Sequence, residues 1–341
     1  MLETIWFALW GVLWAIYFVL DGFDLGLGSL LPALARSEQD KRVIYNAMGP
    51  FWDGNEVWLI TAGGVTFAAF PGTYAVMFSA LYSALMLLLF ALILRGVAFE
   101  FRGKVDSPAW KGLWDVCLWL GSFLPALLLG VAFANIFMGI QIDKDGVYQG
   151  TLFSLLNPYG LLGGVFFVVM FMVHGALWLA IKATGELEER ARAMAKKLWP
   201  LLAILAVVFL VATWFYTKLW ANYLNNVLLW VLPLLAVAGL CLSRVFMAQK
   251  AWGKAWGASA LMIAGATLFG VAGLYPNLLP SSLDPAWSMT VSNSSSSPLT
   301  LKIMLGVALV MVPIVLAYQA WAYVTFRHKI TDEDLAYEEA Y

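Results

Sequence analysis

The sequence of 341 residues has few charged side chains and very few of the residues that commonly bind metals or form disulfides. Charged residues make up 12% of it, which is about half the fraction usual in a soluble domain. Its two cysteines, Cys117 and Cys241, both lie inside apolar runs, so they lack the loop context and spacing of a disulfide framework or a zinc site. A net charge of -1 gives no basic excess of the kind that indicates a nucleic-acid partner. These absences exclude an ordinary soluble domain.

Apolar residues dominate instead: the hydrophobic fraction is 62% and the mean hydropathy is +0.81. Apolar runs of about twenty residues recur along the whole chain, and each is long enough to cross a hydrocarbon layer of about 30 Å. The sequence therefore predicts an all-α integral membrane protein, a single polytopic domain over 1–341 with about nine transmembrane helices. The predicted spans are 5–34, 51–70, 73–101, 110–140, 159–183, 198–222, 227–247, 255–277 and 301–326.

The arrangement of these spans is predicted from their number and from the connections between them. Four plus four spans with one left over fit two four-helix bundles and one peripheral helix. The inner connection 185–197 has good helix formers with acids early and bases late, so we expect a helical extension into the cytoplasm. The Ser-rich outer segment 278–300 is expected to be flexible.

The basic residues predict the orientation of the chain. If the N-terminus lies outside, the odd-numbered connections face the cytoplasm and carry seventeen of the twenty Lys and Arg residues. The three that fall outside are Lys144, Lys218 and Lys302. This asymmetry predicts an N-terminus outside and a C-terminus in the cytoplasm.

Acidic residues inside apolar runs are the most informative feature, because placing one at mid-bilayer costs at least about 2.5 kcal/mol. Asp21 and Asp24 are three positions apart and share a face of the first span. Two carboxylates that close together suit a proton-handling pair. The alternative is that the first span ends near Asp21 and that both acids lie in water.

Asp53 and Glu56, again three apart, begin the second span. An acid in the first turn of a helix stabilises the free N–H groups there, so capping alone is an equally weighted interpretation of Asp53. Trp58 follows in the same span and has an alternative interpretation as part of an interfacial aromatic belt.

Three further charged residues lie near the cytoplasmic ends of spans three and four: Arg95, Glu100 and Asp115. Arg95 can neutralise a nearby carboxylate bidentately, which would make it a structural brace. With the predicted topology, all seven of these charged residues fall in the cytoplasmic half, as a proton-uptake route from that side requires.

Candidate redox ligands are scarce. His174 lies in the fifth span, and a single His among bulky apolar residues is more often a hydrogen-bonded core residue than a haem ligand. His328 lies at a span end between Arg327 and Lys329 and is interpreted as interfacial. We therefore expect no cofactor and no metal bound by this chain.

Several stretches resemble subunit II of cytochrome bd-type quinol oxidases, and the resemblance extends over nearly the whole chain. They are 21–26 (DGFDLG), 52–64 (WDGNEVWLITAGG), 121–123 (GSF), 130–133 (GVAF), 155–164 (LLNPYGLLGG), 184–187 (TGEL) and 276–282 (PNLLPSS). Any one of them is a weak signal, whereas together they are specific. The chain departs from some relatives in a shorter connection over 216–227.

The resemblance implies a complex in a bacterial or archaeal plasma membrane that oxidises quinol, reduces dioxygen to water and supports proton motive force. In that family subunit I carries the b-type and d-type haems and the quinol site, and subunit II carries no haem. By the same analogy, Asp53 belongs to a proton route near the subunit interface and Trp58 lines an apolar path for dioxygen. Asp21, Asp24 and Arg95 match family positions that are less firmly tied to one role. The partners implied are subunit I, a small single-span accessory subunit, membrane lipid and quinone.

Two other functions stay open at this point. A stand-alone proton-coupled transporter would use buried acids in the same way, but it predicts inverted repeats and broken helices, and the sequence shows no clear repeat. A pure scaffold for subunit I would need no route of its own. The sequence distinguishes neither ubiquinol from menaquinol nor the haem types, because those sites are expected in the partner.

Overall fold

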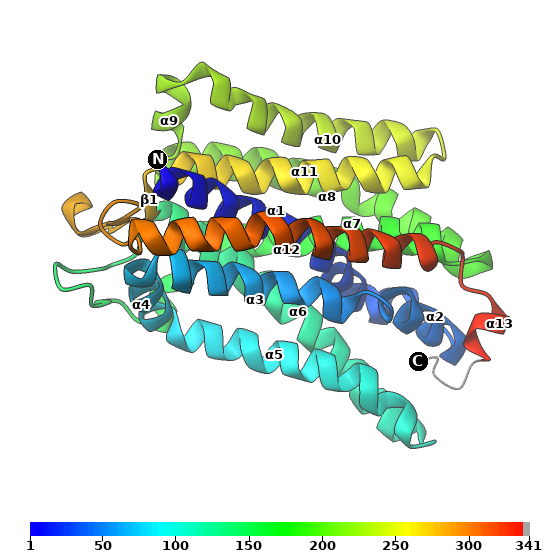
Figure 1. Cartoon of the computed structure of the whole chain (residues 1–341). Helices are drawn as coiled ribbons and strands as arrows, with labels where there is room; N and C mark the ends of the chain where they lie inside the picture. The colour runs from blue at the N-terminus through cyan, green and yellow to red at the C-terminus, as the bar shows by residue number, and fades with distance from the viewer. Residues whose placement is uncertain (337–341) are drawn as a thin grey trace.

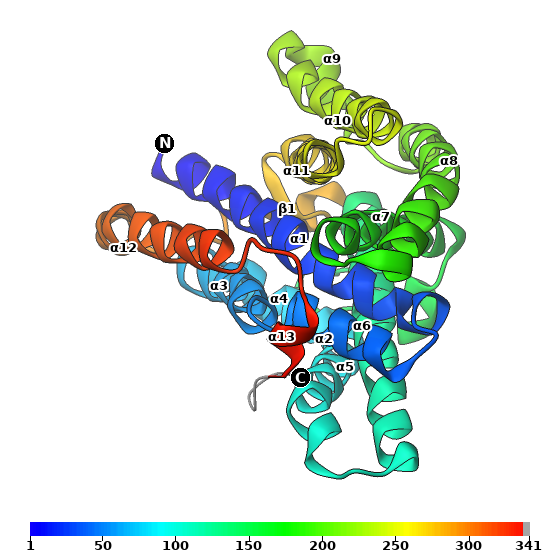
Figure 2. The ribbon, with the colours of Figure 1, turned by 90° about the vertical axis from the view of Figure 1, so that its right-hand side faces the viewer.

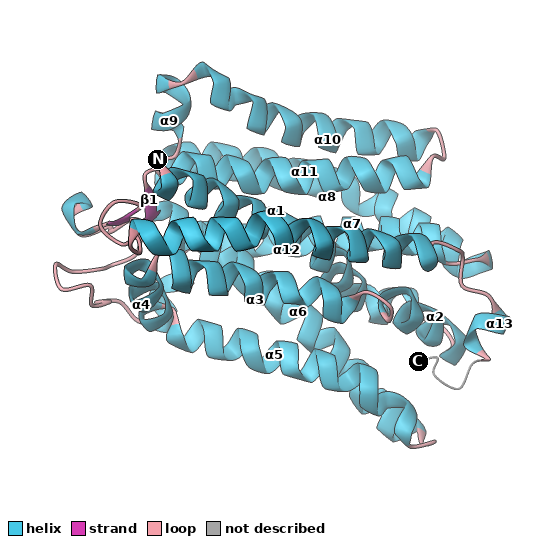
Figure 3. Ribbon diagram, in the orientation of Figure 1, coloured by secondary structure: helices cyan, strands magenta, loops and turns pink. Residues whose placement is uncertain are grey.

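The computed structural model describes residues 1–336, and most of them lie in helices (Figures 1 and 3). The helices are α1 (Leu2–Leu34), α2 (Glu38–Met48), α3 (Trp52–Ala69), α4 (Pro71–Ala80), α5 (Tyr82–Phe101), α6 (Pro108–Met138), α7 (Pro158–Lys182), α8 (Gly185–Tyr216), α9 (Trp220–Asn225), α10 (Val231–Ala248), α11 (Trp252–Leu274), α12 (Pro298–Thr325) and α13 (Asp332–Leu335). Two short strands, β1 (Asn277–Leu279) and β2 (Met289–Thr290), pair antiparallel. The predicted all-α membrane fold is confirmed.

Eight of the helices within residues 1–336 are long and apolar enough to cross a bilayer. They are α1, α5, α6, α7, α8, α10, α11 and α12, some with a flanking turn included. Helix α3, which covers the second predicted span, is not among them: it has only 18 residues, and its first turns contain Asp53, Asn55 and Glu56. The count of nine spans therefore stays a prediction.

The chain runs back and forth between two ends of the molecule (Figure 1). One end carries α2, the α5–α6 and α7–α8 turns, the α10–α11 turn and α13, where the sequence places most of its basic residues. The opposite end carries the N-terminus, α4, α9 and the two strands. Lys144 and Lys218 lie in connections at this second end, so the two ends differ in charge as the orientation prediction requires. Which end faces the cytoplasm is still a prediction.

The third predicted span, 73–101, is not one helix. The structure divides it into α4 and α5 with a break at Leu81, and α4 lies at the end of the molecule that carries the N-terminus (Figure 1). The reason is tertiary: Thr73 Oγ1 donates a hydrogen bond of 2.7 Å to Ser294 Oγ, and the Gly72 N–H donates one of 3.4 Å to the Ser294 carbonyl. The segment 278–300, which we expected to be flexible, therefore forms the small sheet and holds α4.

Helix α1 is the central element, and it packs against α3, α6, α7 and α11 (Figure 2). Its crossing with α7 needs two glycines, because a Cβ on Gly26 would lie 1.7 Å from the Phe171 carbonyl oxygen and a Cβ on Gly175 would lie 2.4 Å from the Leu27 nitrogen. Small residues commonly permit such close crossings in membranes. Helix α6 packs against both α5 and α7, α7 packs against α8 and α11, and α10 packs against α11.

Helix α12 is peripheral and lies beside α3 and α1 (Figure 2), whereas the sequence predicted one peripheral helix without identifying which. Of its 28 residues, only Leu301 is buried. Most of its other apolar residues are exposed, which fits contact with lipid or with another membrane subunit.

Candidate functional site

Three of the predicted charged residues meet in a buried cluster between α1, α3 and α5. Arg95 Nη2 lies 2.7 Å from Asp21 Oδ1 and 2.9 Å from Glu56 Oε2. The side chains of Arg95 and Asp21 are almost fully buried, and that of Glu56 is 22% exposed. Burial of a charge in an apolar region requires such pairing. Within the described residues, Arg95 Nε and Nη1 make no hydrogen bond, so the pairing leaves part of the guanidinium unsatisfied.

Asp24 lies one turn further along α1 and is 1% exposed. Its Oδ2 accepts a hydrogen bond of 2.7 Å from Asn55 Nδ2. Its Oδ1 accepts none within residues 1–336. Asp24 is therefore a buried carboxyl group with one oxygen held and one oxygen able to take or release a proton.

Both acids are buried because α1 does not end near them. The helix continues to Leu34, and every residue from Asp21 to Leu31 is buried. The interpretation that Asp21 and Asp24 lie in water is wrong. The three-residue spacing puts both on the side of α1 that faces α3, where Arg95, Glu56 and Asn55 supply their partners.

Asp115 belongs to a second cluster, near the end of the molecule that carries α2. Arg102 Nε and Lys41 Nζ each lie 2.7 Å from its carboxylate oxygens. Arg102 also binds both oxygens of Glu38 at 2.9 Å, and its guanidinium lies over the Tyr45 ring. Burial and the adjacent Asp115 raise the pKa of Tyr45 above its ordinary range. With two cations in contact, Asp115 has the geometry of a brace that ties α2 to α6.

Asp53 and Glu100 are exposed in this chain. Asp53 Oδ1 accepts a hydrogen bond of 2.7 Å from the Gly54 N–H, so it satisfies one free donor in the first turn of α3. The residue before the helix, Phe51, makes no side-chain capping hydrogen bond. The structure therefore brings together four of the seven predicted residues, Asp21, Asp24, Glu56 and Arg95, and leaves the other three apart.

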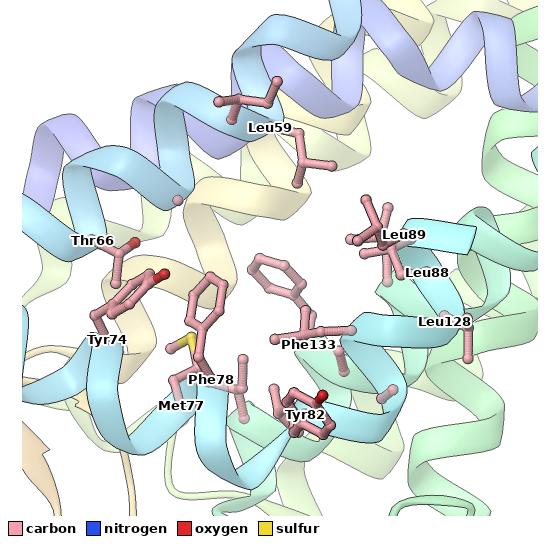
Figure 4. Close-up of a pocket in the computed structure, with 18 of the residues that line it drawn as sticks. Leu59, Thr66, Tyr74, Met77, Phe78, Tyr82, Leu88, Leu89, Leu128 and Phe133 are labelled. Carbon is pink, nitrogen blue, oxygen red and sulfur yellow. The ribbon is translucent and has the colours of Figure 1, made fainter. Parts of the chain in front are cut away.

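Trp58 is 4% exposed and faces α12, where its Nε1 donates a hydrogen bond of 2.8 Å to Gln319 Oε1. The neighbouring Leu59 faces the other way, into an apolar cavity of about 610 Å³ (Figure 4). Side chains from α1, α3, α4, α5 and α6 line this cavity, among them Phe78, Leu89 and Phe133. Trp58 does not line it. Its role on a dioxygen path stays a prediction.

His174 is fully buried and has protein partners for both ring nitrogens. Nε2 lies 3.0 Å from the Val19 carbonyl oxygen, which can only accept, and Nδ1 lies 2.5 Å from Ser259 Oγ. Its ring stacks on Trp256. This geometry supports the interpretation of His174 as a hydrogen-bonded core residue. Among residues 1–336, no group of three or more His, Cys, Asp or Glu side chains is placed to hold a metal ion.

Sequence reasoning missed several residues of the site. Asn55, Gln319 and Tyr323 join α3 and α12 next to Asp24. Lys182 donates hydrogen bonds to the carbonyl oxygens of Phe326 and His328 at the end of α12. A usable signal existed for Gln319, because an amide in the middle of an apolar run needs a partner as an acid does.

Comparisons with known proteins agree with this architecture. Residues 2–326 match the model of the family described as cytochrome bd terminal oxidase subunit II. The chain is 39% identical to a probable cytochrome oxidase subunit 2 of Haemophilus influenzae, over 94% of this chain and 93% of that one. It is 36% identical to the cytochrome bd ubiquinol oxidase subunit 2 of Bacillus subtilis, over 98% of both. It is 37% identical to the cytochrome bd-I ubiquinol oxidase subunit 2 of Escherichia coli, over 98% of this chain and 97% of that one.

Among solved structures, the bd oxidase from Geobacillus thermodenitrificans contains a chain with the same fold. The TM-score is 0.75 at 16% sequence identity, and the match covers 95% of this chain and 98% of that chain. At this identity the likeness concerns the fold alone. The family match over nearly the full length, the three relatives and the shared fold lead to one conclusion: the chain is a member of the cytochrome bd terminal oxidase subunit II family.

Proposed function

We propose that this chain is the haem-free second subunit of a membrane quinol oxidase that oxidises quinol and reduces dioxygen to water. Its partner would be a subunit I that carries the b-type and d-type haems, in a bacterial or archaeal plasma membrane. The support is family membership, together with the printed functions of the Bacillus subtilis and Escherichia coli relatives, which are ubiquinol oxidase subunits. The engaged nitrogens of His174 support the assignment of the haems to the partner.

Within that complex, we assign a proton-handling role to the cluster of Asp21, Asp24, Glu56 and Arg95. The observation that carries this assignment is Asp24, a carboxyl group that is 1% exposed and has one hydrogen-bonded and one free oxygen. Acids kept inside a membrane are costly and often mark proton relays. Arg95 pairs with Asp21 beside Asp24, and the partly exposed Glu56 connects this pair to the surface of the chain.

The surface around Asp53 is the best candidate for contact with subunit I. Val57, Ile60 and Phe67 are 50%, 70% and 60% exposed, and with Asp53 they form one stripe along α3 at helical spacing. An exposed acid at the end of an apolar stripe suits an interface at which a proton passes between subunits. The predicted small accessory subunit would need a further surface, and α8 and α10 are both mostly exposed along their membrane spans.

The apolar cavity between α3 and α5 is the best candidate site for molecules dissolved in the membrane (Figure 4). Its wall is almost wholly apolar, and the hydroxyl of Thr66 is already used, since it accepts from Trp10 Nε1 at 2.9 Å and donates to the Ala62 carbonyl at 2.7 Å. We therefore expect the lipid, quinone or dioxygen partners to contact the chain there through apolar surface. Trp58 would not contact these molecules there, because it lies on the face of α3 directed at α12.

The proposal is tested by purifying a tagged form of this chain in mild detergent from cells that contain the whole complex. Co-isolation of a haem-rich partner with quinol-dependent oxygen consumption is the expected result. The Asp24→Asn variant should assemble with full haem content but with turnover lowered by about 10²-fold or more, the range for loss of a proton-transfer group. Isolation of the chain without a haem partner would instead favour the stand-alone transporter. Normal turnover in Asp24→Asn would reduce the cluster to scaffolding.

A further inference from the structure

Asn55 lies at the centre of a polar network that joins three helices. Its Nδ2 donates to Asp24 Oδ2 at 2.7 Å and to the Leu20 carbonyl oxygen at 3.2 Å, both on α1. Its Oδ1 accepts from Gln319 Nε2 and from the Tyr323 hydroxyl, both at 3.1 Å and both on α12. A side-chain amide has two donor hydrogens and an oxygen with two lone pairs. All four positions of this fully buried amide are used.

The orientation of this amide follows from a residue further along the network. The indole N–H of Trp58 can only donate, and it lies 2.8 Å from one atom of the Gln319 amide, which must therefore be Oε1. The Gln319 NH₂ group then faces Asn55, so the Asn55 atom that it meets must be the oxygen. The Asn55 NH₂ group is consequently directed at Asp24. A flipped amide would place an oxygen against the Asp24 carboxylate and against a backbone carbonyl.

The network also helps to place α12, together with aromatic contacts such as that of Tyr323 with Phe51. Gln319 and Tyr323 are four residues apart and share the face of α12 that meets the bundle. Leu301 is the one buried side chain of the helix, and its carbonyl accepts a hydrogen bond of 3.0 Å from Trp6 Nε1 at the outer end. Met304, Leu305 and Ala308 pack the earlier turns of α12 against the core, and the bonds to Asn55 and Trp58 add polar contacts near its C-terminal end.

We propose that Asn55 is the positioning residue for Asp24, and that the line from Trp58 through Gln319 to Asn55 couples the placement of α12 to the orientation of that carboxylate. The proposal rests on the proton-handling role proposed above for Asp24. Asn55 does not exchange a proton itself. It holds Oδ2 of Asp24 in one direction, so that Oδ1 is the atom that exchanges protons.

A double-mutant cycle tests this coupling, with quinol-dependent turnover measured per assembled complex. Asn55→Ala should lower turnover by about tenfold, but by less than about twofold in an Asp24→Asn background, because a residue that acts through another has no separate effect once that partner is changed. Asn55→Ala should also alter the pH dependence of turnover, whereas a loss of packing would lower turnover equally at every pH. Trp58→Phe, which removes only the N–H donor, should reproduce the effect in weaker form. If Asn55→Ala does not assemble, Trp58→Phe is measured in its place in the wild-type and Asp24→Asn backgrounds.

Asn135 offers a matched control in α6. It is also a buried amide, and it donates to the carbonyl oxygens of Val131 and Leu155 at 2.8 and 2.7 Å and accepts from Asn157 Nδ2 at 2.7 Å, but it contacts no acid. Asn135→Ala should leave the pH dependence of turnover unchanged.

The outcomes separate the two proposals. Unchanged turnover in Asp24→Asn overturns the proton-handling role itself. Lowered turnover in Asp24→Asn, combined with an equal effect of Asn55→Ala in both backgrounds or an unchanged pH dependence, overturns only the positioning role of Asn55.

Discussion

Arg95 on α5 lies 2.7 Å from Asp21 on α1, and the two side chains are 1% and 0% exposed. Removing one partner of such a pair leaves an uncompensated charge in an apolar region. Arg95→Leu should therefore destabilise the protein by about 3–5 kcal/mol, the range for a broken buried pair. The measurement is the yield of folded complex during thermal unfolding in detergent.

Two variants serve as controls for this prediction. Asp21→Asn combined with Arg95→Leu should recover part of the loss, because it removes the stranded charge of Asp21. Lys111→Ala breaks a pair in which Asp106 is 98% exposed, and it should change stability by no more than about 1 kcal/mol. A loss as large in Lys111→Ala as in Arg95→Leu would contradict the importance of burial.

The second prediction concerns the orientation of the chain. A reporter that is active only in the cytoplasm should be active when fused after Tyr341 and inactive when inserted near Ser295. The reason is the excess of basic residues at the end that carries α2 and α13. Reversed activities would place that end outside. Activity at both sites, or at neither, would contradict a membrane crossing by α12 between them and with it the nine-span prediction.

The sequence was sufficient to predict the buried acids but not the residues that surround them. Asp21 and Asp24 are conspicuous because charge in an apolar run is expensive, and the structure does bury them. Asn55 carries no charge, and its partners Gln319 and Tyr323 are 264 and 268 positions away. No local pattern reports a contact over that distance.

The break between α4 and α5 escaped prediction for a related reason. The apolar run over 73–101 contains no proline, and hydropathy cannot distinguish a helix that lies across the membrane surface from one that continues through it. The contacts of Thr73 and Gly72 with Ser294, more than 200 residues further on, determine the direction of α4. Asp115 was likewise predicted without its partners Lys41 and Arg102, which lie far from it or outside its own helix, and its place on a proton route stays a prediction.

The third prediction is that this chain, expressed alone, binds no stoichiometric haem. His174 is the one histidine within the apolar helices, and both of its ring nitrogens are engaged, by Val19 and Ser259. A haem assay on the purified subunit checks this. One haem per chain that is lost in His174→Ala would overturn the assignment of the haems to the partner subunit.

The fourth prediction concerns pH and the segment that follows α12. The Thr331 N–H and hydroxyl donate to Asp334 Oδ2 at 2.8 and 2.9 Å, and these bonds, with His328 beside the carboxylate, lower the pKa of Asp334 below its ordinary value of 3.8. A group whose pKa is lower in the folded state stabilises that state above its ordinary pKa and loses this contribution as pH falls through the folded value. Hydrogen exchange at the Leu335 amide should therefore accelerate, relative to its intrinsic rate, as the pH drops below about 4. Asp334→Asn should show no such transition, and a transition of equal size in that variant would assign it to another group.

The last prediction distinguishes the two interpretations of Asp53. This residue is exposed in this chain, and among the described residues its carboxylate accepts a hydrogen bond only from the Gly54 N–H. Asn keeps the size of the side chain and still accepts that bond, so Asp53→Asn should have little effect on turnover if the role is to satisfy the first turn of α3. A relay acid must instead exchange protons in every cycle, and Asn cannot do so. We expect oxygen consumption per assembled complex to fall in Asp53→Asn as far as it does in Asp53→Ala, at every pH tested, with haem content unchanged. Wild-type turnover in a fully assembled Asp53→Asn complex would make Asp53 a structural residue and would leave Asp24, with its free carboxyl oxygen, as the acid through which protons enter this subunit.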